Sequence, residues 1–125
     1  FFLMKVFSEE GRIGLQGASG RMLVPESVGS VLEKNGYAGK EVVVGIRAED
    51  IHMASAAEDG QDGHFSGRFQ EQAGKGALLR FQTGDAEGVC LAEGKAEFRE
   101  DEKLYLSVDA EKLYLFDKDT EKNIL

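Results

Sequence analysis

The stretch Val42–Met53, VVVGIRAEDIHM, joins two different residue patterns. Three consecutive valines are typical of a buried strand, and the run stops at Gly45. A charged Arg-Ala-Glu-Asp group follows directly. Within it, Asp50 lies three residues after Arg47 and can pair with it, and the acids suit the positive end of a short helical turn. The stretch therefore predicts a corner that ends a strand, makes one helical turn and folds Ile51 back onto the valine face.

The length and charge of the chain limit what it can do. Its 125 residues suffice for one ordinary domain or for two small intertwined units. A net charge of −8 disfavours nucleic acid and anionic membrane surfaces, because both are bound by clustered Lys and Arg. No apolar run approaches the roughly 18 residues of a membrane span. A single cysteine, Cys90, excludes an internal disulfide and fits a reducing compartment. Since residue 1 is not methionine, we expect an internal piece of a longer polypeptide.

Short alternating segments run along most of the chain, and turn residues separate them. We expect strands over 1–7, 11–16, 20–24 and 41–47, and one helix from Pro25 to the Asn35-Gly36 stop, with Val28, Val31 and Leu32 on one face. The glycine-rich acidic segment 54–63 predicts a loop or a boundary between halves. Further period-two sets follow: Phe65/Gly67/Phe69, Ala77/Leu79/Phe81, Val89/Leu91, Ala96/Phe98, Leu104/Leu106/Val108 and Leu113/Leu115. The pattern predicts an all-β fold of small barrels or paired sheets with one short helix.

Motifs for catalysis or cofactor binding are missing from the sequence. Three Gly-Lys pairs occur, but none is followed by the Ser or Thr of a P-loop. His52, His64 and Cys90 lack the paired spacing of zinc ligands, and the tail from Asp117 lacks the glycine and glutamate of a calcium loop. A turn in which Asp117 and Thr120 bond to nearby backbone is the better interpretation of that tail. We therefore predict no catalytic, cofactor-binding or metal-binding residue.

Several segments also resemble one known family, in the same order along the chain. VGIRAEDI (Val44–Ile51) resembles the GIRPEDI element of the TOBE domain, the carboxy-terminal regulatory domain of ABC-importer ATPases. FQEQAG (Phe69–Gly74) is similar to its Glu-x-x-Gly step, and LSVDAEKLYLFDKDT (Leu106–Thr120) to its closing VDPEKLHLFDPETG. The opening Phe1-Phe2-Leu3 also resembles the family. The match covers nearly the whole chain except residues 54–63 and is closest to the sugar-importing branch, which includes the maltose-transporter ATPase.

The resemblance implies a fold and a setting. Residues 1–125 would form a TOBE-type pair of intertwined OB-like halves, with a possible break near 54–63. The amino-terminal domain that binds ATP and Mg and hydrolyses ATP would be absent. The domain would pair with its counterpart in an ATPase homodimer, work with membrane permease subunits, in some members receive a regulatory protein, and lie on the cytoplasmic face of the membrane. The family-motif residues, structural or interfacial, would be Gly45, Arg47, Glu49, Asp50, Glu71, Gly74, Phe116, Asp117 and Thr120.

Departures from the family pattern and alternative functions remain. Ala48 and Ala110 stand where the family has proline, so proline at either position should stabilise the fold. Related barrels bind oxyanions such as molybdate, and the glycines between Gly11 and Gly20 could offer backbone N–H groups to one. Polyamine, iron and sulfate importers carry related tails. An OB-type barrel could also bind single-stranded nucleic acid, but the basic groove this requires is not evident.

Overall fold

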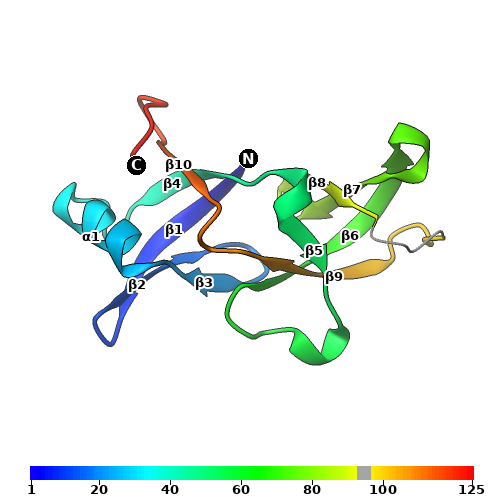
Figure 1. The fold of residues 1–125 in the computed structure, drawn as a ribbon, viewed down its shortest axis with the longest axis horizontal. Coiled ribbons are helices and arrows are strands. Elements are labelled where there is room, and N and C mark those ends of the chain that lie inside the picture. The colour runs from blue at the N-terminus through cyan, green and yellow to red at the C-terminus, as the bar shows by residue number, and fades with distance from the viewer. Residues whose placement is uncertain (93–96) are drawn as a thin grey trace.

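The computed structural model describes residues 1–92 and 97–125, which contain ten strands and one α-helix. The strands form two antiparallel sheets of five, drawn at the left and right of Figure 1. In spatial order, the first sheet contains β10 (Tyr114–Asp117), β4 (Glu41–Gly45), β1 (Phe2–Glu9), β2 (Arg12–Gln16) and β3 (Arg21–Leu23). The second contains β5 (Ile51–Met53), β9 (Lys103–Val108), β6 (His64–Ala73), β7 (Leu78–Thr83) and β8 (Ala86–Leu91). The predicted all-β class is confirmed.

One helix was predicted, and α1 (Glu26–Lys34) confirms it. Pro25 is its N-cap and Asn35 its C-cap, and Leu32 on its inner face is fully buried. Three short 3-10 turns complete the described elements: η1 (Ala48–Asp50), η2 (Ala56–Glu58) and η3 (Gly74–Gly76). The strand expected at Ala96/Phe98 is not seen at Phe98, which lies outside any strand and stacks on Phe69 with ring centroids 5.1 Å apart. Ala96 lies outside the described residues.

The second sheet is inserted into the first in chain order. The chain leaves the first sheet after β4, crosses at 46–50, builds all of the second sheet, and returns through 109–113 to pair β10 with β4. The crossing therefore falls on the Arg-Ala-Glu-Asp group and does not coincide with 54–63. That loop instead covers the edge of β3, where Gly63 N–H donates to the Arg21 carbonyl at 3.0 Å and Leu23 N–H donates to the Asp62 carboxylate at 2.7 Å.

Each sheet buries its own core. The first core contains Met4, Val6, Ile13, Leu15, Met22, Val24, Leu32, Val42, Val44 and Leu115, and the second contains Ile51, Phe69, Leu79, Phe81, Cys90, Ala92, Leu104 and Leu106. Phe2, Ile46 and Val108 pack against both cores and so join them. The expectation that Ile51 packs onto the valine face is wrong, because the chain changes sheets between Gly45 and Ile51. Fully burying one Val, Leu, Ile, Phe or Met side chain of these cores stabilises the fold by about 1.5–3 kcal/mol relative to leaving it exposed.

A turn around Asp117 fixes the C-terminal segment to the first sheet. One carboxylate oxygen of Asp117 accepts the N–H groups of Asp119 and Thr120 at 2.9 and 2.8 Å. The other accepts the Tyr37 hydroxyl, which follows α1, at 2.6 Å. The Tyr37 hydrogen bond and then these backbone donors lower the pKa of Asp117 to about 2, and the same bond raises the pKa of Tyr37. The turn predicted for this tail is confirmed.

We expect Asp117→Asn to make stability less dependent on acid pH. A carboxyl whose pKa is lower in the folded state stabilises the fold above its unfolded pKa, and this contribution is lost as pH falls toward the folded value. The unaltered chain should therefore lose more unfolding free energy than Asp117→Asn between about pH 5 and pH 2. Urea unfolding across this range, with exposed Asp119→Asn as control, measures the difference. An equal loss in the Asp117 variant and the unaltered chain would contradict this assignment.

Proline at position 48 or 110 should raise the melting temperature. Each alanine occupies the second position of a turn, since Asp50 N–H donates to the Arg47 carbonyl at 2.9 Å and Lys112 N–H to the Asp109 carbonyl at 3.1 Å. Proline's fixed φ suits that position, and each substitution should add about 0.4–1 kcal/mol. Ala54→Pro is the matched control and should be destabilising, because the Ala54 N–H donates to Tyr105. Unchanged or lower midpoints for both test variants would count against the turn geometry.

Candidate functional site

The predicted motif residues around Arg47 meet at the first crossing between the sheets. The Arg47 guanidinium lies over the Tyr114 ring, 5.3 Å from its centroid, and its Nη1 lies 3.7 Å from Glu49. Asp50 instead lies 3.8 Å from the Lys112 ammonium. The expected pairing of Arg47 with Asp50 is therefore wrong, because η1 directs Asp50 toward the segment that returns to β10. The chain leaving the first sheet thus contacts the chain returning to it through Arg47 with Tyr114 and through Asp50 with Lys112.

Gly45 lies at this corner between Phe1 and Tyr114. It ends β4 and is buried, and a Cβ placed on it would lie 3.0 Å from the Phe1 ring and 3.4 Å from the Cβ of Tyr114. The first distance is tighter than ordinary packing and the second is ordinary van der Waals contact, so a Cβ here would require the exposed Phe1 ring to shift. β1 and β10 both pair with β4 beside this position.

The remaining motif residues lie in two other places. Phe116, Asp117 and Thr120 belong to β10 and the turn after it. Glu71 and Gly74 lie on the β6–β7 hairpin of the second sheet, where Glu71 pairs with Arg80 at 3.2 Å and Gly74 has a φ of +58°. The motif residues are thus distributed among a corner, a C-terminal turn and a hairpin. They do not form a single reactive centre.

The residues considered as metal ligands are also separated. His52 and His64 both pair in register with Ser107, on opposite sides of β9, so they stand two strands apart. Two strand spacings amount to about 9–10 Å, too far for a shared ion. His64 instead lies 3.1 Å from Glu58, and Cys90 is buried in the second core. Within residues 1–92 and 97–125 no group of three or more His, Cys, Asp or Glu is arranged to hold a metal.

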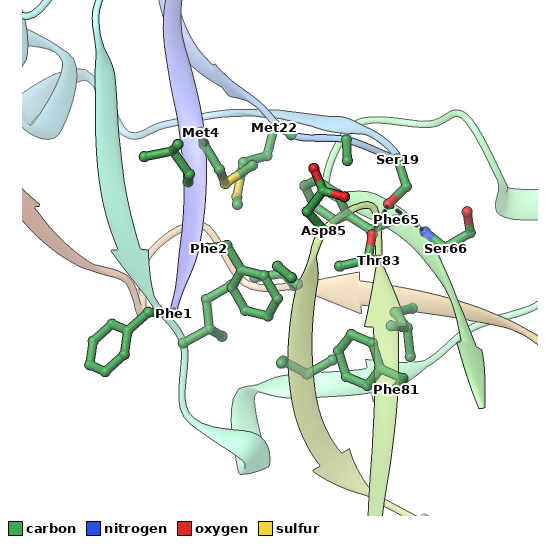
Figure 2. Close-up of a pocket in the computed structure, with 18 residues that line it drawn as sticks. Phe1, Phe2, Met4, Ser19, Met22, Phe65, Ser66, Phe81, Thr83 and Asp85 are labelled. Carbon is green, nitrogen blue, oxygen red and sulfur yellow. Dashed lines mark hydrogen bonds between the residues drawn. The ribbon is translucent and has the colours of Figure 1, made fainter. Parts of the chain in front are cut away.

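A cavity between the two sheets is a feature that the sequence did not reveal. Its volume is about 480 Å³, and Figure 2 shows Phe2 and Phe81 along one side and Met4 and Met22 at the top. The rings of Phe2 and Phe81 are stacked, 6.4 Å apart. These residues come from distant parts of the chain, so no local spacing could have indicated that they share a cavity.

The polar groups of this cavity bond to each other. The Ser19 and Thr83 hydroxyls are 2.9 Å apart, and Ser19 also accepts the Ser66 N–H at 3.1 Å. Asp85 lies beside them in Figure 2 and is exposed. Among the described residues, neither hydroxyl has a histidine or a carboxylate as its hydrogen-bond partner, and such a partner is the base that would activate a nucleophile. Ser19, Thr83 and the Ser66 backbone therefore position one another across the two sheets.

Comparison with known proteins identifies relatives along nearly the whole chain, although no family model matches. The oligosaccharides import ATP-binding protein MsmX of Bacillus subtilis is 28% identical over 109 residues, covering 85% of this chain and 30% of the relative. The sn-glycerol-3-phosphate import ATP-binding protein UgpC of Cereibacter sphaeroides is 32% identical over 111 residues, covering 82% of this chain and 31% of the relative. The trehalose/maltose import ATP-binding protein MalK of Thermococcus litoralis is 29% identical over 127 residues, covering 98% of this chain and 34% of the relative.

The chain thus spans about a third of the length of these relatives. Its described residues contain no helix long and apolar enough to cross a membrane. The similarity runs through the corner at Arg47, the hairpin and the C-terminal turn, because it covers nearly all of the chain. The chain is therefore similar, over 82–98% of its length, to one segment of these import ATP-binding proteins.

Proposed function

We propose that this chain is the C-terminal TOBE-type domain of the ATP-binding subunit of an ABC importer for sugars. The observation that carries the proposal is similarity over 82–98% of the chain to three import ATP-binding proteins. The antiparallel two-sheet fold supports it, since it agrees with the OB-like architecture that the sequence resemblance implies. The relatives favour this assignment over a molybdate-type oxyanion domain and over polyamine, iron or sulfate importers.

In this proposal the chain holds partners in place, and the chemistry takes place in the rest of the subunit. The remaining two thirds would bind ATP and Mg and hydrolyse ATP. Two such subunits would form a homodimer beneath the membrane permease subunits, on the cytoplasmic face, and a regulatory protein would contact some members. The two joined cores, which share Phe2, Ile46 and Val108, suit a rigid element of this kind.

A chimera tests the proposed function. This chain should replace the corresponding segment of Bacillus subtilis MsmX and restore oligosaccharide import to a strain that lacks MsmX, because the segment is proposed to do the same work in both proteins. Growth on the oligosaccharide and uptake of labelled sugar measure the outcome. A Gly/Ser linker of equal length is the control and should not restore import. A chimera that accumulates, hydrolyses ATP and still fails to import would overturn the proposal.

We further propose that the motif residue Arg47 is mainly structural. Its side chain is 61% exposed, and its contacts are the Tyr114 ring and Glu49. Arg47→Ala should therefore cost the isolated chain about 0.5–1 kcal/mol, the usual worth of an exposed cation–π contact. Arg47→Lys is the matched control and should recover part of that loss. Import by the chimera should persist in both variants; its loss from a folded Arg47→Ala chimera would instead show that Arg47 contacts a partner.

A further inference from the structure

The outer face of the first sheet carries a partly exposed apolar patch. We define the β10 patch as Phe1, Leu3, Val43, Tyr114 and Phe116. Leu3, Val43 and Phe116 are in register across β1, β4 and β10, and Phe1 meets Phe116 edge-on at 5.9 Å. Phe1 is 79% exposed, Leu3 46% and Tyr114 39%, whereas Val43 and Phe116 are half-buried between them. A contiguous group of exposed apolar side chains usually marks an interaction surface.

Charged pairs of both signs border this patch. At one end Arg47 lies over Tyr114 and close to Glu49. At the other end Lys118 pairs with Glu41 at 3.0 Å. Neither end carries an excess of one sign, although the chain as a whole has a net charge of −8. An apolar centre with a mixed polar rim is typical of a protein–protein contact, and it is not the pattern expected for nucleic acid or an anionic membrane.

Both termini of the chain lie beside the β10 patch. Phe1 belongs to it, and the last residues run along β10, where Asn123 bridges to Phe116 and the Ile124 N–H donates to the Leu115 carbonyl at 2.8 Å. Figure 1 shows the two ends on either side of β10. At whichever end a longer polypeptide continues, its next residues begin next to this surface. A tethered partner reaches an effective concentration of about millimolar, well above that of a free second copy.

We infer that the β10 patch docks against the rest of the same ATP-binding subunit, on a surface with an apolar centre and charges of both signs around it. This inference rests on the proposed function, because it requires the remaining two thirds of such a subunit. The docked surface would give the domain a fixed orientation on the part that binds ATP. The aromatic residues Phe1, Tyr114 and Phe116 would supply most of the buried area, as aromatic side chains commonly do at interface centres.

Cysteine alkylation in two contexts tests the inference. Leu3→Cys places a thiol in the patch, and Val89→Cys places one on the outer face of the second sheet, where Val89 is exposed to a similar degree, 38%. The native Cys90 is fully buried and gives a slow background. Each variant is prepared as the 125-residue chain and as the complete subunit, and peptide mass spectrometry follows iodoacetamide labelling. Leu3→Cys should react about tenfold or more slowly in the complete subunit, because docking must open before the thiol reacts.

The outcomes separate the possible occupants of the patch. Slower labelling at position 3 and unchanged labelling at position 89 supports docking within the subunit. Equal rates at position 3 in both contexts, or equal slowing at both positions, overturns the inference. It is also overturned if labelling at position 3 slows as protein concentration rises, in the isolated chain or in the complete subunit, because a second copy would then cover the patch. If labelling shows docking while the MsmX chimera fails to import, the docking stands and the proposed function does not.

Discussion

The pairing of β10 with β4 is the constraint on which the rest of the fold depends. It aligns Tyr114–Asp117 with Val42–Gly45 across almost seventy intervening positions, as the two ranges show. The whole second sheet must therefore fit between two strands that lie side by side. This forces two crossings to run close together, and they contact one another through Arg47 with Tyr114 and Asp50 with Lys112. Residues shared between the two cores then fix one sheet against the other.

The elements that depend on near neighbours could be predicted from the sequence. The alternating pattern of 1–7, the valine run within 41–47 and the caps at Pro25 and Asn35 predicted β1, β4 and α1, because residue pattern and capping act within a few residues. The Asp117 turn was predicted for the same reason. The strand expected at Ala96/Phe98 was wrong at Phe98. The Phe98 ring stacks on Phe69, and this tertiary contact outweighs the period-two pattern that predicted a strand.

What the sequence did not reveal depends on contacts between distant residues. The change of sheet at Gly45–Ile51 depends on the later pairing of β10 with β4, and no pattern near Gly45 indicates that pairing. Arg47 was expected to pair with Asp50, but Lys112, sixty-two positions away by its number, lies near Asp50 instead. Tyr37 and Asp117 are likewise far apart in sequence. The cavity between the sheets is assembled in the same way, and the motif residues occupy three separate places.

The antiparallel arrangement of β1, β4 and β10 also determines how the chain would respond to tension. Because β1 and β10 both bond to β4, opposite forces applied at Phe2 and at Asp117 pass through these three strands and load their hydrogen bonds in shear. The second sheet lies outside that load path, although its residues occupy the middle of the sequence. Strain arriving through either end is thus carried by one sheet, while the other keeps its shape until the first gives way.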